Sequence, residues 1–298
     1  MFRTMKIVTT AAVCIVLSVD AASGQDGKPE SDPPEKRLEV FDLGKFGHST
    51  TIDNKWFPVK PRTRWVYEGT SVEDDGKVVP HRIIVTVTDL TKVISGVRTV
   101  VSYDLDYSDG ELVEAELAFY AQDDNGNVWQ FGEYPEEYED GKLIKAPAWI
   151  HGLKAARAGI IMQAQPRLGT ASFAQGWGPA VGWKDRGVTY QVGQKVTVPS
   201  GIYEDVLVIK ESATGEPDAE QLKYYAPAVG NIRTGWIGTG AKVTETLELV
   251  SIGQLDQKAL AEVRAGALRL EHSAYRNSRE VYAKTKPVKA ETVGKAGM

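Results

Sequence analysis

The chain has 298 residues, of which 42% are hydrophobic and 25% are charged, with 29 Gly and one Cys. This composition is typical of a globular protein and excludes collagen-like, coiled-coil and wholly disordered chains. The 35 Lys and Arg residues are outnumbered by 40 Asp and Glu residues. This mild acidity argues against a nucleic acid or an anionic membrane surface as partner.

Residues 1–24 predict a secretory signal peptide. Basic residues precede an apolar run at 7–19, and small residues follow at 21–24, which is the order of a signal peptide with its cleavage site. The apolar run is too short to span a bilayer, so we expect no membrane span and a secreted or periplasmic location. Cleavage removes Cys14, and the mature chain then has neither a disulfide nor a thiol nucleophile.

The remaining chain divides by composition. Residues 25–37 are rich in proline and charge and predict a flexible tether. Residues 38–253 contain about nine short runs of β-branched and aromatic residues separated by turn residues, which predicts a mainly β domain. We expect an antiparallel, curled sheet or a barrel-like meander. Within it, residues 142–186 lack any period and hold many Gly, Ala and Trp residues, so they predict an irregular insertion, which is a functional lid, a binding loop or a poorly ordered stretch.

The C-terminal part, residues 254–284, predicts an amphipathic helix with Asp256 as its N-cap. Its apolar residues alternate in steps of three and four: Leu260, Val263, Ala267, Leu270 and Ala274. We expect the β domain of the same chain to cover this stripe. Residues 285–298 have no apolar pattern and predict a disordered tail.

One hairpin places several carboxylates on one face. A three-residue turn at 108–110 pairs Leu105 with Val113 and keeps apolar residues together, whereas a two-residue turn would pair apolar with polar positions. Four acids then share the other face: Asp104, Asp106, Glu114 and Glu116. Three interpretations stay open, namely a solvated outer face, a Ca²⁺ or other hard-cation site that includes Asp104 and Asp106, and the paired carboxylates of a glycan-active enzyme.

A second group of candidates is aromatic. Trp149, Trp177 and Trp183 all fall within residues 142–186, close to His151. The rings either fix this segment to the sheet or form a platform for a sugar ring or another flat ligand. His151 is the only histidine in this region and is therefore its candidate general base.

Several motifs resemble those of a family of exported bacterial β-proteins for which no activity is known. They are WFPVKP at 56–61, WVYEG at 65–69, FYAQD at 119–123, GNVWQFGE at 126–133 and YYAPAVG at 224–230. The resemblance covers roughly residues 53–252 and implies a β domain that a helix often follows. The family pattern has Gly where this chain has Ala228, so a different turn is expected there. The resemblance implies no catalytic residue.

No GxSxG, HExxH, phosphate-loop or CxxC motif occurs in the chain, so the sequence favours no known catalytic machinery. We expect an exported, soluble protein that binds a glycan, a small molecule or an envelope component. The alternatives are a glycan-active enzyme, either lyase or hydrolase, and a calcium-binding or structural component; no cofactor other than Ca²⁺ is expected. The candidate site combines a floor of Tyr120, Glu114 and Glu116 with a lid of His151, Trp177 and Trp183.

Overall fold

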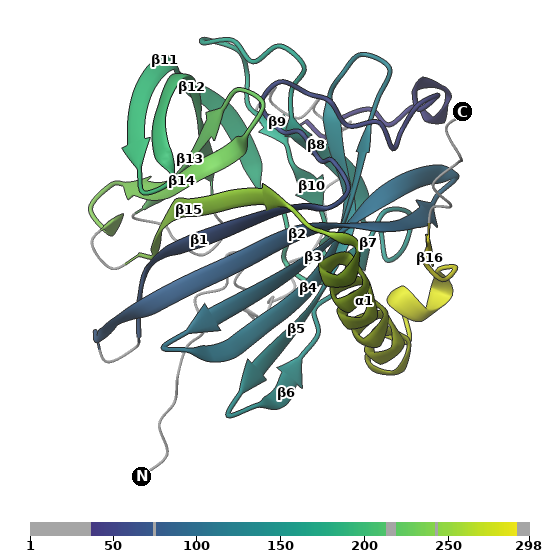
Figure 1. Ribbon diagram of the computed structural model, residues 1–298. Coiled ribbons are helices and arrows are strands. Elements are labelled where there is room, and N and C mark those ends of the chain that lie inside the picture. Colours follow the sequence, from purple (N-terminus) through teal and green to yellow (C-terminus); the bar gives the residue numbers. More distant parts are fainter. Residues whose placement is uncertain (1–36, 74–75, 213–218, 242–243, 291–298) are drawn as a thin grey trace, which may run out of the picture.

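The structure, a computed structural model, describes residues 37–73, 76–212, 219–241 and 244–290. The predicted signal peptide and all but the last residue of the predicted tether lie outside these ranges. The described residues form one antiparallel sheet of sixteen strands and one α-helix, α1 (Gln257–Asn277) (Figure 1). The expectation of a mainly β protein with a curled sheet and a C-terminal helix is confirmed.

The long strands follow one another as neighbours and form two halves of the sheet. The first half contains β1 (Thr63–Val72), β2 (Val78–Ile94), β3 (Val97–Ser108), β4 (Glu111–Gln122) and β5 (Val128–Glu139). The second half contains β11 (Arg186–Val198), β12 (Gly201–Ser212), β13 (Glu220–Ala226), β14 (Gly230–Ile237) and β15 (Thr246–Gln254). Strand β15 pairs with β1 and joins the two halves.

The segment 142–186 has more regular structure than its composition predicts. It contains β6 (Lys142–Lys145), β7 (Trp149–Ile150), β8 (Arg157–Met162), β9 (Phe173–Ala174) and β10 (Gly176–Trp177). Strands β6, β7 and β8 pair with β5, β10 pairs with β8, and β9 pairs with β11. Three of these strands have only two residues and are too short to show a period in the sequence, and the expectation of an irregular insertion was wrong here.

The two ends of the sheet approach each other without joining. Strands β8 and β10 lie at one end and β9 at the other. A side chain on Gly159 of β8 would come within 2.4 Å of the carbonyl oxygen of Ala174 in β9, so only glycine permits this approach. No ladder joins β9 to β8 or β10 in the described part of the chain, and the sheet is therefore strongly curled but open.

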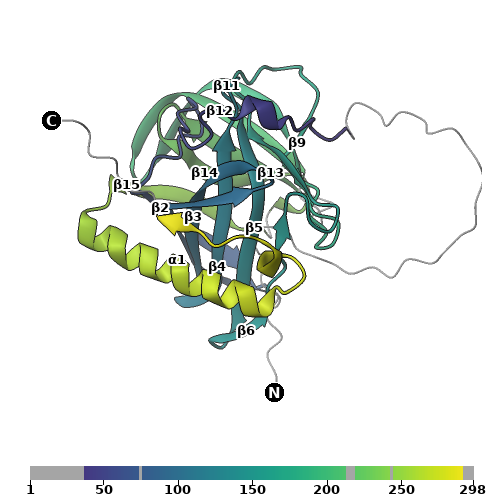
Figure 2. The ribbon, with the colours of Figure 1, turned by 90° about the vertical axis from the view of Figure 1, so that its right-hand side faces the viewer.

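Helix α1 covers one face of β2, β3 and β4 (Figure 2). Asp256 caps it, since its Oδ1 accepts a hydrogen bond from the Ala259 amide at 2.8 Å. All five residues of the predicted stripe are buried. Gly266 lies directly against the ring of Tyr103, where a Cβ atom would be 3.0 Å from the ring. The chain thus covers the helix stripe with its own sheet.

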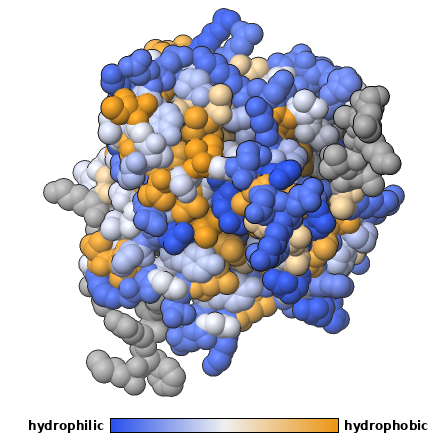
Figure 3. All heavy atoms as spheres, viewed as in Figure 1, coloured by the Kyte–Doolittle hydropathy of each residue, from blue (hydrophilic) through white to orange (hydrophobic). Residues whose placement is uncertain are grey.

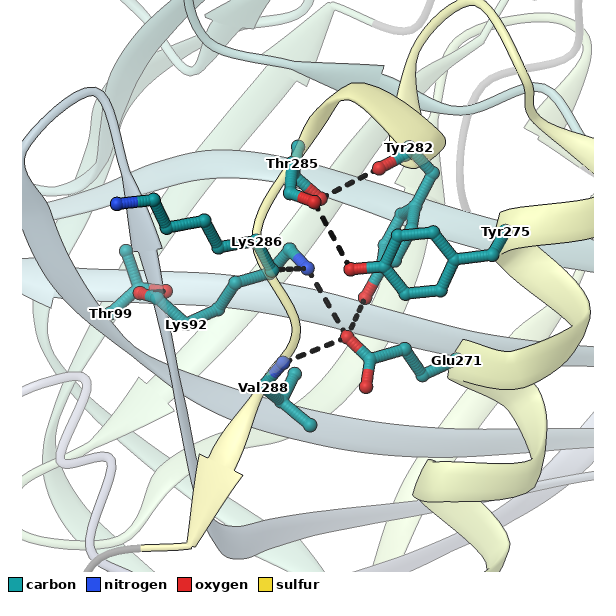
Figure 4. Close-up of polar contacts among 8 residues, drawn as sticks. All are labelled: Lys92, Thr99, Glu271, Tyr275, Tyr282, Thr285, Lys286 and Val288. Carbon is teal, nitrogen blue, oxygen red and sulfur yellow. Dashed lines mark hydrogen bonds and ion pairs between the residues drawn. The ribbon is translucent and has the colours of Figure 1, made fainter.

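The segment after α1 returns to the sheet. It contains a 3₁₀ helix (Tyr282–Lys284) and β16 (Lys289–Ala290), which pairs with β2. Lys92 of β2 donates hydrogen bonds to Glu271 Oε1 at 3.2 Å and to the Lys286 carbonyl at 2.7 Å (Figure 4). The expectation of disorder from residue 285 is therefore wrong for 285–290, because a buried lysine from a distant strand holds this segment.

The hairpin of β3 and β4 differs from its predicted register. Its turn has two residues, Asp109 and Gly110, both with positive φ, as mirror-image hairpin turns require. A bulge beside Tyr107 then shifts the register, so that Leu105 lies opposite Ala115 rather than Val113. The shorter turn and the bulge together displace the pairing by two residues. A shift of two residues leaves every side chain on its predicted face.

The outer surface is mixed in character. On the face that carries α1, hydrophobic residues form small groups between hydrophilic ones (Figure 3). A further 3₁₀ helix (Leu43–Lys45) precedes β1. Within the described ranges, no helix is long and apolar enough to cross a membrane.

Candidate functional site

The curled sheet lines an open-sided cavity of about 220 Å³ on the face opposite α1. Side chains alternate between the two faces of a strand, so on β3 Tyr103 contacts the helix while Asp104 faces the cavity. Both halves of the sheet contribute to its wall, which also includes residues 57–59 and Trp183. A cavity of this size accommodates a small molecule, because one of about 150 Å³ holds benzene.

One wall of the cavity carries carboxyl groups. Asp104 lies opposite Glu116 and Asp106 lies opposite Glu114 in the ladder of β3 and β4, and Glu133 follows on β5. Burial raises the pKa of both Asp104 and Glu133 to about 7. Like charges opposite each other repel, and the low polarity of the interior strengthens this effect. The carboxyl wall therefore holds protons near neutral pH.

Glu114 is the member of this carboxyl wall that has a buried oxygen without a hydrogen-bond donor among the described residues. Only 5% of the residue is exposed, and its Oε2 has no hydrogen-bond partner among the residues that the structure describes. Burial, followed by the charges of Asp106, Glu137 and Glu133, raises its pKa well above the usual range. A buried acceptor without a donor is costly, so this oxygen is suited to receive a hydrogen bond from a ligand.

Two cationic side chains lie beside the carboxyl wall, and each already has acidic partners. His81 Nε2 is 2.6 Å from Asp106 Oδ1, and its Nδ1 is 3.2 Å from Glu245 Oε2. Burial opposes protonation of His81, but these two carboxylates outweigh it and raise its pKa to about 10. Lys223, which lines the cavity, lies 2.9 Å from Glu211 Oε2.

The other wall of the cavity is apolar and aromatic. Trp65 donates its indole hydrogen bond to the Val229 carbonyl at 2.7 Å, and the Tyr67 hydroxyl donates to the Asn231 carbonyl at 2.9 Å. Their polar atoms are thus satisfied by backbone carbonyls. The apolar wall consists mainly of Phe57, Pro58, Val59, Trp65, Tyr67, Ile83, Val85, Val87, Tyr225 and Leu247.

The structure brings together four of the six predicted ligand-binding residues. Tyr120, Glu114, Glu116 and Trp183 all line the cavity, as do Asp104 and Asp106. The interpretation of the acidic hairpin face as a solvated outer surface is wrong, because Asp106, Glu114 and Glu116 are buried. The curl of the sheet places that face inside, and curl depends on all the strands together.

His151 and Trp177 are not among the residues that line the cavity. His151 packs against Phe41 at 4.6 Å between ring centroids, and its Nδ1 accepts a hydrogen bond from the Ala158 amide at 3.0 Å. Burial, with a smaller effect of Arg157, lowers its pKa. Trp177 belongs to β10 and lies opposite Arg157 in the ladder.

Trp149 and Trp183 stack on each other, with ring centroids 5.9 Å apart and an angle of 19° between the planes. Trp149 is fully buried, so it fixes segment 142–186 in place, while Trp183 also lines the cavity. The aromatic segment therefore both packs and contributes to the site.

The structure lends no support to a metal site at Asp104 and Asp106. In the ranges that the structure describes, no group of three or more His, Cys, Asp or Glu residues is arranged to hold a metal ion. The turn at residues 123–127, after β4, is also rich in oxygen atoms, but the carboxylate of Asp123 already has hydrogen-bond partners. Both carboxylate oxygens of Asp123 accept hydrogen bonds, from Asn125, Asn127 and Trp129.

Sequence reasoning missed His81, Glu133, Lys223 and Glu245. His81 lies on β2, and the other three follow on β5, on β13 and just before β15, far from one another in the chain. Nothing local marks them. A local pattern does exist for two residues of the apolar wall, because the alternation along β1 places Trp65 and Tyr67 on the same face of the strand.

The sequence matches no family model and no curated protein. Two solved structures resemble the fold, each covering 67% of this chain and all of its own, at 12% identity. One, with a TM-score of 0.40, is inferred to be an exported protein with a YmcC-like fold from Bacteroides fragilis. The other, with a TM-score of 0.36, is an inferred lipoprotein from Parabacteroides distasonis. Such scores are too low to support any inference about this protein.

Proposed function

We propose that this protein binds a small organic ligand in the cavity of the curled sheet. The observation that carries the proposal is the division of this cavity, with aromatic and aliphatic side chains on one wall and buried carboxyl groups on the other. Small-molecule sites are concave and mostly apolar, with a few polar groups that orient the ligand. The unpartnered Oε2 of Glu114 is such a group.

The proposed place of action is outside the cytoplasm. It is supported by the order of basic, apolar and small residues in 1–24, which is typical of a cleaved signal. N-terminal sequencing of the protein from the producing cells tests this part. A mature chain that begins near residue 24 supports it, and a chain that still begins at Met1 contradicts it.

Binding is tested by ligand-detected NMR with a library of small molecules that includes mono- and disaccharides. Val85 lines the cavity, and Val85→Trp fills it. Ile84 is the next residue on β2 and is not among the lining residues, so Ile84→Trp is the matched control. We expect Val85→Trp to abolish the signals of bound compounds and Ile84→Trp to retain them. Equal binding by both variants would place the ligand elsewhere and contradict the proposal.

A glycan-active enzyme is the second candidate. It is favoured by the pKa values of about 7 for Asp104 and Glu133, since a general acid must hold its proton at the working pH. Incubation with a panel of polysaccharides, with detection of reducing ends and of unsaturated products, tests this candidate. Turnover that Asp104→Asn or Glu133→Gln abolishes would favour catalysis over binding alone.

A further inference from the structure

The cavity combines groups that suit a positively charged guest. On its carboxyl wall, Asp104 accepts a hydrogen bond from Ser102 at 2.6 Å, and Glu133 accepts one from Gln130 at 2.9 Å. Glu114 Oε2 accepts none from the residues that the structure describes. Several acids thus converge on a space in which one acceptor still lacks a donor.

The cations near the cavity already have partners. His81 lies between Asp106 and Glu245, and Lys223 lies beside Glu211. Lys223 is the one Lys or Arg among the described lining residues, and its ion pair directs its charge toward Glu211. The carboxyl wall therefore has more acidic groups than cations that could neutralise them.

The apolar wall fits the remainder of such a guest. Trp65 and Tyr67 use their polar atoms on backbone carbonyls, so what they present to the cavity is ring surface. Aromatic faces attract cations, and they also bury the apolar body of a ligand. An anion, by contrast, would face several carboxyl groups.

We propose that the cavity selects a small organic cation, namely a primary or secondary amine on a compact apolar body, with the ammonium group at Glu114 and Glu116. This inference rests on the proposed binding function and names the chemical class of its ligand. The ammonium group donates to Glu114 Oε2, and the apolar body lies against Trp65, Val85 and Tyr225.

Binding of a cation also displaces protons, because a nearby positive charge favours the ionised form of a carboxyl group. Burial and neighbouring acids raise the pKa values of Glu114 and Glu116 well above the usual range. The titratable groups that line this space or interact with those that do are Tyr67, His81, Asp104, Asp106, Glu114, Glu116, Tyr120, Glu133, Glu137, Asp185, Tyr203, Glu211, Lys223, Tyr225 and Glu245. We expect net release of protons on binding at pH 7.

Three probes with the same ring separate charge from shape. They are cyclohexylmethylamine, cyclohexylmethanol and cyclohexanecarboxylate, measured by titration calorimetry in two buffers of different ionisation enthalpy. We expect the amine to bind at least about tenfold more tightly than the alcohol, a difference of about 1.4 kcal/mol, and to release protons. The carboxylate is expected not to bind.

Variants assign the effect to the carboxyl wall. Glu114→Gln and Glu116→Gln are expected to lower the affinity for the amine at least about tenfold and to leave that for the alcohol unchanged. Glu111→Gln is the matched control, because Glu111 lies on the same strand but is exposed and outside the cavity. Circular dichroism verifies that each variant is folded.

The outcomes separate this inference from the proposed function. Equal affinities of amine and alcohol, both lost in Val85→Trp, would overturn the selection of a cation and leave the binding function intact. Amine binding that survives both Glu→Gln substitutions would likewise overturn it. Binding of none of the three probes overturns the inference, and failure of the wider library as well overturns the proposed function.

Discussion

Lys92 of β2 and Glu271 of α1 form an ion pair at 3.2 Å between Nζ and Oε1, although they lie 179 positions apart in the chain. Both side chains are buried, and the Tyr282 ring centroid lies 4.1 Å from the Lys92 ammonium. Glu271 Oε1 also accepts hydrogen bonds from the Tyr282 hydroxyl and the Val288 amide. The carboxylate of Glu271, on the helix, therefore binds both the sheet and the C-terminal segment (Figure 4).

Removal of this carboxylate is expected to destabilise the fold strongly. Glu271→Leu leaves the Lys92 charge buried without its partner, which costs about 3–5 kcal/mol in comparable pairs. The double variant Lys92→Met with Glu271→Leu is expected to regain at least about 2 kcal/mol, because an apolar pair replaces the stranded charge. Urea unfolding at pH 7 measures both.

The exposed pair Lys195 and Glu204, 2.8 Å apart, supplies the control for this experiment. Glu204→Leu is expected to cost less than about 1 kcal/mol, because solvent screens an exposed pair. Strict additivity of the two substitutions at Lys92 and Glu271 would contradict the coupling.

The carboxyl wall is expected to lower stability as the pH rises. Burial raises the folded-state pKa of Glu114 above its unfolded value, so the native state binds more protons than the unfolded state above about pH 4.5. The contribution of Glu114 to the stability of the fold is therefore fully present below that pH and is lost as the pH rises through the folded-state pKa. Glu114→Gln removes this loss and is expected to stabilise the protein by about 1 kcal/mol or more at pH 8.

Thermal unfolding at pH 4.5 and pH 8 measures this effect. The gain from Glu114→Gln should shrink at pH 4.5, where the wild-type carboxyl group is protonated. Glu111→Gln, on the exposed part of β4, is expected to change stability at neither pH. An equal gain at both pH values would argue for a packing effect rather than for charge.

His81 and His151 are expected to differ in charge near neutral pH. The carboxylates of Asp106 and Glu245 raise the pKa of His81 to about 10, whereas burial lowers that of His151. Long-range ¹H–¹⁵N NMR at pH 8 should show protons on both ring nitrogens of His81 and a neutral ring at His151. The variants His81→Gln and His151→Gln assign the two signals, and a neutral His81 at pH 8 would contradict the expectation.

The same shift predicts a pH-dependent contribution of His81 to stability. Because its folded pKa is raised, the stability that it contributes is fully present below about pH 6.5 and is lost as the pH rises toward 10. His81→Gln is therefore expected to cost more at pH 6 than at pH 10, on the order of 3 kcal/mol at the lower pH. The lowered pKa of Lys92, about 8, acts in the opposite sense above pH 8, so the comparison uses the difference between wild type and variant.

Ala228 offers a gain in stability. It has φ of +62° in the turn between β13 and β14, a conformation that favours glycine. Ala228→Gly is expected to raise the free energy of unfolding by about 0.5–1 kcal/mol.

Urea unfolding measures the effect of Ala228→Gly, with Ala226→Gly as its control. Ala226 is buried at the end of β13, where glycine is expected to cost about 1 kcal/mol. A loss of stability in Ala228→Gly would mean that unfolded-chain entropy outweighs the relief of strain.

Much of the fold could be predicted from local pattern. The stripe from Leu260 to Ala274 and the cap at Asp256 depend on residues within a few positions of one another, so they identify the helix and its buried face. Alternation likewise assigned Asp104 and Glu116 to one face of their hairpin. That assignment survived an error in the register, because the shorter turn and the bulge together shift the pairing by an even number of residues.

Which face of that hairpin is inside was decided by tertiary structure alone. Period-2 alternation is the same for a concave and a convex face, and the curl arises from the twist of all strands together. For the same reason the sequence could not pair His81 with Glu245, or Lys92 with Glu271. Their contacts depend on elements that are distant in the chain and meet only in the folded protein. Local chemistry determined which residues share a face, and long-range packing determined that the acidic face is buried in the cavity.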